Sequence, residues 1–288
     1  MAATSGDHPE AVTVLVQAGA DMNQEDEDGR TALMWAKREA AKTLLALGAD
    51  VNYANSKDGM TALMVAGRQP EMVKLFIEAG ADVHLADNWG QTALFHAEGD
   101  DEESVKLLLA AGADVNHADN EGQTVIFEAA RDGRLESLKL LFDAGADAQH
   151  ANNEGRTALF EPFFCYDENG EIYDDHVASV KLLIATGVDV NHVANDGSTA
   201  LSRNTAALQT ATENVQNADE EEDDIERIER LEVNVASLAE IVALINERIA
   251  QLAELAKQAA AEVASSGEGA STGEAKAKGG GESGKRKR

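Results

Sequence analysis

The sequence predicts an all-α solenoid of repeated helix pairs joined by turn fingers, followed by one long helix and a C-terminal tail. Two observations lead to this prediction. The string Gly-Ala-Asp recurs at spacings of 29, 32, 32 and 33 residues, and a Gly-Val-Asp variant follows after 42. Nearer the end, apolar residues recur with a period of seven instead. Periods of these two lengths are typical of repeat arrays and of coiled coils respectively.

Each repeat contains three sequence elements that stay in phase. The Gly-Ala-Asp strings begin at Gly19, Gly48, Gly80, Gly112 and Gly145, and the variant begins at Gly187. A second string, mostly Thr-Ala-Leu, precedes each later copy, and a glycine lies two residues before its Thr. Chance would not keep three elements in phase through the whole series, so the sequence predicts an array with a period of about 32 residues.

The fourth copy shows why such a unit folds as a helix pair. Gly122 suits a tight turn, and Thr124 can cap the short helix that follows it. Gly133 breaks this helix, and Gly145 ends a second, leucine-rich helix as a C-cap glycine. Two short helices cannot bury their apolar faces alone, so neighbouring pairs must stack into a thin continuous core. An aromatic content of only 4% fits such a core.

The pattern resembles ankyrin repeats, in which DxxGxTPLHxAA is followed by VxxLL and GADVN. Asp119-Asn-Glu-Gly122-Gln-Thr124 and Gly112-Ala-Asp-Val-Asn116 show the match, which covers roughly residues 2 to 203. One departure recurs, because the histidine of the family pattern is replaced by Met or Phe. The replacements are Met34, Met64, Phe95, Phe127 and Phe160. The resemblance implies that this histidine ties neighbouring turns together, so its absence predicts looser turns that packing must hold.

The copies differ in length, and these differences predict where the array departs from regularity. From Thr to the next Gly the successive copies count 17, 19, 20, 21 and 30 residues. We expect the shortfalls in the bend between the two helices, and an insertion at the same place within residues 163–176. A half repeat precedes five full repeats and a partial sixth in residues 1–203. Its ragged start would leave one face uncovered, unless the true start lies upstream. A capping helix and an acidic linker follow in residues 204–224.

Residues 225–264 have a heptad pattern that predicts an amphipathic or coiled-coil helix. All eleven seam positions are apolar. The candidate oligomerisation residues are Ile228, Leu231, Val235, Leu238, Val242, Ile245, Ile249 and Leu252. β-Branched residues at the first seam position favour a homodimer. The additional apolar residues Ile241 and Leu255 favour a trimer, or packing against the protein's own repeats, and the pattern leaves these alternatives open.

Composition and charge exclude several classes of protein. The 53 acidic and 24 basic residues give a net charge of −29, which excludes a general nucleic-acid binder. The single cysteine excludes a disulfide framework. No run of 18 apolar residues and no basic N-terminal cluster occur, so we expect neither a membrane span nor a signal peptide, and a cytoplasmic location. The acidity fits a basic partner or a high-salt environment. The Gly-, Ser- and Lys-rich residues 265–288 predict a disordered tail.

No pattern of catalytic, metal-binding or cofactor-binding residues stands out. His117, His150 and His192 share one position in successive repeats, where stacked helices lie about 8–10 Å apart, so we interpret them as exposed turn residues. The insertion resembles the middle of a calcium loop but has Cys165 and His176 at the two positions that need carboxylates, and a hairpin is the better interpretation. We therefore predict a structural thiol, no metal, no cofactor and no enzymatic activity.

The resemblance to ankyrin repeats implies a non-catalytic scaffold that binds a protein partner through turn tips and inner helices. The matching positions begin in the first turn with Glu25, Glu27, Asp28 and Arg30. The other candidates are Trp35, Lys57, Met60, Asn88, Trp89, Gln91, His96, Asn120, Glu121, Gln123, Glu128, Asn153, Glu154, Arg156 and Glu161. Trp89 stands out as a large apolar ring on a turn tip, either a binding residue or one folded over its neighbour. The alternative function is an adaptor in which the coiled coil is the main interaction element.

Overall fold

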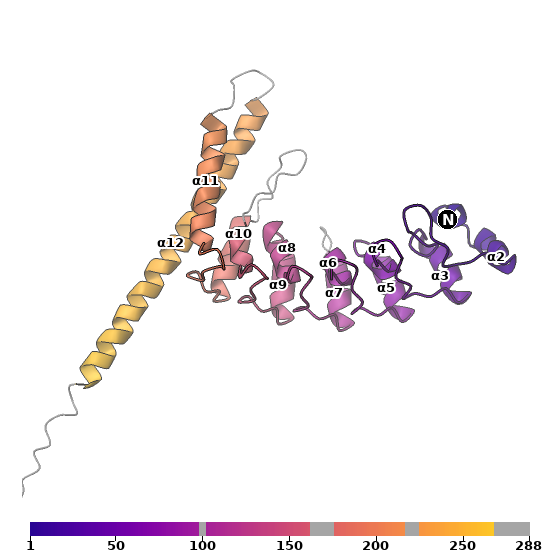
Figure 1. Ribbon diagram of the computed structural model, residues 1–288, viewed down its shortest axis with the longest axis horizontal. Coiled ribbons are helices and arrows are strands. Elements are labelled where there is room, and N and C mark those ends of the chain that lie inside the picture. The colour runs from indigo at the N-terminus through magenta and orange to yellow at the C-terminus, as the bar shows by residue number, and fades with distance from the viewer. Residues whose placement is uncertain (98–101, 162–175, 217–224, 268–288) are drawn as a thin grey trace, which may run out of the picture. The chain divides into compact units, whose positions relative to one another are not determined.

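The computed structural model describes residues 1–97, 102–161, 176–216 and 225–267. Within these ranges every regular element is helical, and extended segments pair only in two isolated bridges, Ala86 with Thr92 and Val193 with Thr199. Helix pairs follow one another along the chain, each beside the next (Figure 1). The prediction of an all-α solenoid of helix pairs is confirmed.

The second helix of each pair contacts its counterparts in the neighbouring repeats, in chain order. These outer helices are α2 (Pro9–Gln17), α3 (Arg38–Ala46), α5 (Pro70–Glu78), α7 (Glu102–Ala110), α9 (Leu135–Asp143) and α10 (His176–Ala185). A proline begins α2 and α5, where its missing N–H costs no hydrogen bond. Gly48 and Gly112 follow α3 and α7 with φ of 92° and 91°, a left-handed conformation that glycine adopts without strain.

The first, inner helix of each pair is shorter and varies between copies. The inner helices are α1 (Ala2–Ser5), α4 (Ala62–Val65), α6 (Ala93–His96), α8 (Val125–Arg131) and the 3-10 helix η1 (Ala158–Phe160). Between Thr31 and Arg38 only turns are formed. The expectation that short copies lose residues from the bend is therefore wrong, because the inner helix shortens instead. The insertion predicted within residues 163–176 lies outside the described residues except for His176.

Apolar residues at equivalent positions form the core, one layer for each repeat. Phe95, Phe127 and Phe160 occupy the position of the family's histidine and are 4%, 0% and 1% exposed. Thr124 lies at the N-cap of α8 but its hydroxyl makes no capping hydrogen bond, whereas the Thr61 hydroxyl accepts one from the Met64 N–H at 3.4 Å. Packing of large side chains therefore contributes more to these inner helices than capping does.

An asparagine ladder connects successive turns. Asn120, Asn153 and Asn195 each donate a backbone N–H to a carbonyl of the preceding turn at 2.9–3.0 Å, and a side-chain N–H to another at 2.9–3.1 Å. A Cβ on Gly122 would lie 2.6 Å from the Asn153 Oδ1 atom, so this contact requires glycine. Asn88 repeats the arrangement with a longer side-chain bond of 3.4 Å. The turns are not loose, and the expectation of looser turns is wrong.

A histidine series adds a second connection between repeats. His117, His150 and His192 each place Nε2 2.8 Å from a glycine carbonyl oxygen of the preceding turn. Their rings also meet the edges of Phe95, Phe127 and Phe160 at centroid distances of 5.9–6.5 Å. These half-buried histidines are not the freely exposed turn residues that the sequence suggested. They provide the ties between turns that the replaced histidines would otherwise make.

Two longer helices follow the repeats. The helix α11 (Ala200–Gln216) continues into the long helix α12 (Ile225–Gly267) after an undescribed connection. Leu238 of α12 packs with Ala207 and Ala211 of α11 in one apolar cluster. Glu240 of α12 lies 3.0 Å from Lys181 of α10. The first part of α12 therefore docks on the chain's own array, the intramolecular alternative to a coiled coil.

The predicted seam residues of α12 have different environments. Leu238 and Ile245 are 3% and 0% exposed, and Ile241 beside them is fully buried. Val235, Val242, Ile249 and Leu252 are half-buried, and the side chains of Ile228 and Leu231 lie outside the description. Met1–Asn246 forms one compact unit and the rest of α12 belongs to a second. Burial within one chain accounts for Leu238 and Ile245, and oligomerisation through the seam stays a prediction.

Candidate functional site

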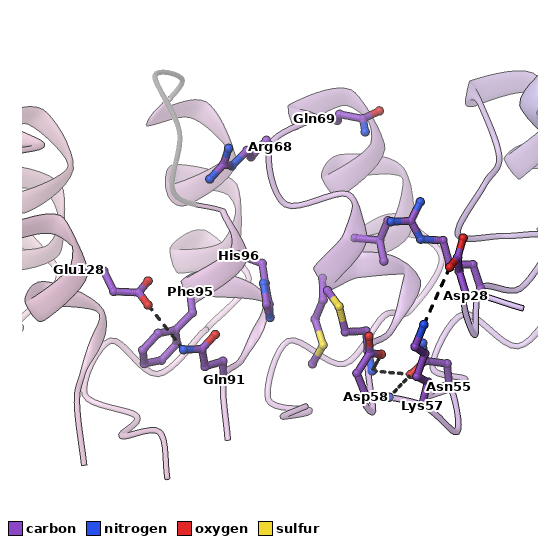
Figure 2. Close-up of a pocket in the computed structure, with 14 residues that line it drawn as sticks. Asp28, Asn55, Lys57, Asp58, Arg68, Gln69, Gln91, Phe95, His96 and Glu128 are labelled. Carbon is purple, nitrogen blue, oxygen red and sulfur yellow. Dashed lines mark hydrogen bonds and ion pairs between the residues drawn. The ribbon is translucent and has the colours of Figure 1, made fainter. Parts of the chain in front are cut away.

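A groove with a volume of about 780 Å³ lies along the turns and inner helices of the first half of the array (Figure 2). Its lining is drawn from four successive repeats, from the first turn to α8. The lining residues are Asp28, Arg30, Asn55, Lys57, Asp58, Met60, Met64, Val65, Arg68, Gln69, Gln91, Phe95, His96 and Glu128. Because neighbouring repeats are tied by hydrogen bonds, these side chains are presented on a connected framework.

The groove combines an apolar base with charged walls. Met64 and Phe95 are almost fully buried and close the base, while Met60 and Val65 are half-buried. Basic and acidic side chains line the same groove, and Lys57 Nζ lies 3.9 Å from Asp28 Oδ1. Such an arrangement suits an extended segment with both apolar and polar side chains, because the base can receive the former while the walls pair with the latter.

Turn aspartates position two side chains that occupy the same place in their repeats, Trp35 and His96. Asp26 accepts the Arg30 N–H at 2.8 Å through Oδ1 and the Trp35 Nε1–H at 2.6 Å through Oδ2. The hydrogen bond from the Arg30 backbone is the main cause that lowers the pKa of Asp26. Asp87, whose side chain is fully buried, repeats the arrangement with the Gln91 N–H and with Nε2 of His96 at 2.9 Å. Trp35 and His96 are thus held toward their own turns.

Glu128 occupies the same position in the fourth repeat but cannot act as a donor when ionised. The Asp119 Oδ1 atom again accepts two backbone N–H groups, from Glu121 and Gln123. Burial raises the pKa of Glu128 to about 7, with nearby acidic groups adding to the effect and arginines opposing it. Gln91 Nε2 lies 3.5 Å from Glu128 Oε1 (Figure 2). The Glu128 carboxyl is therefore partly protonated near neutral pH.

Arg156 and Glu154 are committed to ion pairs within the chain. Arg156 pairs with Glu154 in its own turn and lies 3.3 Å from Asp196 in the next turn. Hydrogen bonds from Ser198 are the main cause that lowers the pKa of Asp196 to about 2, and Arg156 adds to it. Burial raises the pKa of the neighbouring Glu161. Neither Arg156 nor Glu154 lines the groove.

The groove brings together seven of the side chains that the sequence suggested for partner binding. They are Asp28, Arg30, Lys57, Met60, Gln91, His96 and Glu128. Trp89 lies outside the groove with its residue surface 56% exposed, so it does not fold over its neighbour. Trp35 is bonded to Asp26 and stacks with Arg30, whose guanidinium carbon lies 4.6 Å from the ring centre.

Several other suggested binding residues have structural roles. Asn88, Asn120 and Asn153 form the asparagine ladder, and their contact with a partner stays a prediction. Glu25 bonds to the Ser56 N–H at 2.6 Å and to the Tyr53 hydroxyl at 3.1 Å, which ties the first turn to the second. Exposed Glu121 accepts the Gln123 side-chain N–H at 3.0 Å. Sequence reasoning could not separate these residues from true surface residues, because their partners lie in the neighbouring turn.

Sequence reasoning missed part of the groove. Met64 and Phe95 were recognised as departures from the family pattern but interpreted as packing residues alone. Arg68 and Gln69 lie in the bend after α4 and are exposed. The sequence signal for Arg68 and Gln69 was the short Thr-to-Gly interval of the second copy, which places the bend close to the end of the inner helix. Asn55 and Asp58 belong to the second turn, where the sequence had indicated only Lys57 and Met60.

Of the predicted insertion, the structure describes His176 alone. His176 begins α10, is 2% exposed, and places Nε2 3.1 Å from the Arg131 carbonyl oxygen. Cys165 lies outside the described residues. Among His, Cys, Asp and Glu side chains that are described, no group is placed to hold a metal ion. Of the described helices, none contains a segment with the length and hydropathy required to cross a membrane.

Comparison with known proteins identifies the repeat type. The family model described as ankyrin repeats in three copies matches overlapping segments, residues 1–87, 37–119, 66–152 and 94–192. The crystal structure of the ankyrin repeat domain of Bcl-3, described as a unique member of the IkappaB protein family, is similar in fold with a TM-score of 0.57. That likeness covers 69% of this chain and 90% of the Bcl-3 chain at 23% identity, and no curated protein matches. The chain belongs to the ankyrin repeat family.

Proposed function

We propose that this chain is a non-catalytic interaction scaffold whose groove binds an extended segment of a protein partner. Ankyrin repeats are protein–protein interaction modules, and repeat arrays present extended binding surfaces. The observation that carries the proposal is the lining of a single groove by side chains from four successive repeats. The single cysteine allows no disulfide within the chain, which is typical of proteins in a reducing compartment, so we keep the cytoplasm as its proposed location.

The ties between repeats support a binding role for this surface. A binding surface made of several repeats is useful only if those repeats keep their spacing, because a partner must contact them together. The asparagine ladder and the histidine series supply such ties at successive turns. Arg68 and Gln69 line the groove and are exposed.

The alternative function, an adaptor that acts mainly by oligomerisation, receives less support. Leu238 and Ile245, two of its central seam residues, are already buried in the same chain. A coiled coil built from them would first require α12 to leave the array. The partly exposed residues Ile249 and Leu252 and exposed Leu255 keep this alternative testable.

Site-specific photo-crosslinking tests the proposal. A benzophenone amino acid replaces Gln69 in the groove or Lys74, which is exposed on the outer helix α5, as the matched control. The full-length chain is then irradiated in an extract of its source cells, and the cross-linked proteins are identified by mass spectrometry. We expect a protein partner that cross-links from position 69 and not from position 74.

A third probe position separates the two functions. With the benzophenone at Leu255, cross-links between two copies of this chain would favour the adaptor function. Equal capture of the same partner from positions 69 and 74 would contradict binding in the groove. Circular dichroism checks that all three variants keep the helical content of the wild type.

A further inference from the structure

Arginine and lysine occupy different parts of the array. One position of the outer helices carries an exposed lysine, in Lys42, Lys74, Lys106, Lys139 and Lys181. The turns, bends and inner helices carry arginine, in Arg30, Arg68, Arg131, Arg134, Arg156 and Arg203. Three residues depart from this division: Arg38 at the start of α3, which pairs with Glu71 at 2.8 Å, Lys37 at the N-cap of α3, and Lys57 in the second turn. The planar guanidinium can form two parallel hydrogen bonds to a carboxylate, whereas the lysine ammonium is a strongly hydrated point charge.

Two of these arginines line the groove and form no ion pair with a described residue. Arg30 makes a cation–π contact with Trp35, with its guanidinium carbon 4.6 Å from the ring centre. Arg68 is exposed in the bend after α4. Across the ranges that the structure describes, neither side chain lies within ion-pair distance of a carboxylate. Among the described residues, both are therefore without an ion pair that would compete with an anionic group in the groove.

The acidic side chains of the groove offer less charge to a ligand than its basic side chains do. Asp28 lies 3.9 Å from Lys57 Nζ, and Asp58 accepts the Met60 N–H at 3.3 Å. Glu128 is partly protonated near neutral pH, because burial raises its pKa to about 7. Three basic side chains thus face two ionised carboxylates and one partly neutral carboxyl. The charges of the described lining are therefore close to balanced, although the whole chain carries −29.

We propose that the groove binds an acidic segment of its protein partner, with carboxylates of that segment paired to Arg68 and Arg30. The proposal rests on the proposed function and names the chemistry of the ligand. A basic segment is the ligand that the net charge alone suggests, but it would meet two guanidinium groups that have no ion pair among the described residues. Ion pairing at short range decides between an acidic and a basic ligand, because charges elsewhere on the surface are screened beyond about 10 Å at moderate salt.

Selection from a random dodecapeptide library displayed on phage tests the ligand chemistry without a known partner. The bait is the full-length chain, and the groove variant carries Arg30→Glu and Arg68→Glu. The control variant carries Lys74→Glu and Lys106→Glu, the same change of charge on exposed positions of the outer helices. We expect the wild type and the control to enrich Asp- and Glu-containing peptides over the input library, and the groove variant to lose this enrichment.

The affinities of synthetic copies of the selected peptides provide the second measurement. In fluorescence anisotropy titrations we expect Arg68→Glu alone to weaken binding by about tenfold or more, since hydrogen bonds between charged groups are among the strongest. Arg68→Lys keeps the charge but loses the paired N–H groups, so we expect an intermediate loss. Circular dichroism confirms that each variant is folded.

The outcomes separate this inference from the proposed function. Peptides that depend on the groove but are basic or uncharged would overturn the acidic ligand and leave groove binding intact. Acidic peptides that bind the groove variant as well as the wild type would also overturn the inference, because their site would lie elsewhere. If the binding of no selected peptide depends on Arg30 and Arg68, and no selected peptide binds in the groove, both the inference and the proposed function fail.

Discussion

The partly buried carboxyl of Glu128 makes the stability of the array depend on pH in a predictable direction. Its pKa is raised from 4.5 to about 7, mainly because burial disfavours the ionised form. A carboxyl with a raised pKa binds more protons in the folded chain than in the unfolded chain. Its contribution is therefore neutral at low pH, and it destabilises the fold increasingly as pH rises from 4.5 through 7.

The magnitude follows from the difference between the two pKa values. At about 1.4 kcal/mol for each pKa unit, the ionised carboxyl lowers the free energy of unfolding by about 3 kcal/mol above neutral pH. This is an upper value, since the side chain keeps some contact with water, and about 1–2 kcal/mol is a realistic expectation. Glu128→Gln removes the charge and keeps the shape, so the variant should gain this stability at alkaline pH and little at acidic pH.

Urea unfolding followed by circular dichroism measures the effect at about pH 5 and about pH 8.5, on either side of the raised pKa. Glu121→Gln is the matched control, because Glu121 is exposed on the turn before α8 and carries the same charge. We expect the two variants to differ at the higher pH only. If Glu128→Gln gains nothing over Glu121→Gln at about pH 8.5, the Glu128 carboxyl is hydrated and the reasoning from burial is refuted.

Three further substitutions test other parts of the structure. Asn153→Ala removes the 2.9 Å bond to Asn120 and should lower the free energy of unfolding by about 1 kcal/mol, measured in urea, without changing partner affinity; a loss of affinity alone would restore a binding role. Trp89→Ala should leave the melting temperature nearly unchanged because Trp89 is 56% exposed, and calorimetry should show a loss of roughly 2 kcal/mol in partner binding if the ring is a hot spot. Leu238→Asp with Ile245→Asp should destabilise the end of the array on which α12 docks. In sedimentation equilibrium we expect a monomeric mass for both the wild type and this variant. A wild-type dimer that these two substitutions dissociate would support the coiled coil.

Much of the fold follows from the sequence because its signals are local and periodic. Gly-Ala-Asp ends each outer helix in a conformation that glycine favours, so the positions of Gly48, Gly80 and Gly112 mark the repeats directly. The position of Phe127 in its repeat predicts a core residue, and it is fully buried. Spacing along one chain was enough here, because each repeat contacts only its neighbours.

The candidate site was only partly predictable. The turn positions Arg30, Lys57 and Gln91 were found because turn tips follow the repeat pattern. Arg68 and Gln69 were missed, because it was the shortening of the inner helix that placed their bend beside the groove. A deletion can shorten different parts of a repeat. The packing of each part against its neighbours decides which part shortens, and the number of residues does not contain this information.

The sequence by itself determined the type of repeat, its order and the apolar stripe of α12. Only the tertiary structure decided which polar and apolar side chains were already used within the chain. Asn153 has its partner 33 residues away in the preceding turn, and Leu238 packs with Ala211 in another helix. A periodic pattern shows that a side chain faces outward or forms a stripe. Whether that side chain meets solvent, a neighbouring repeat or another helix depends on distances between segments, which stacking in three dimensions sets.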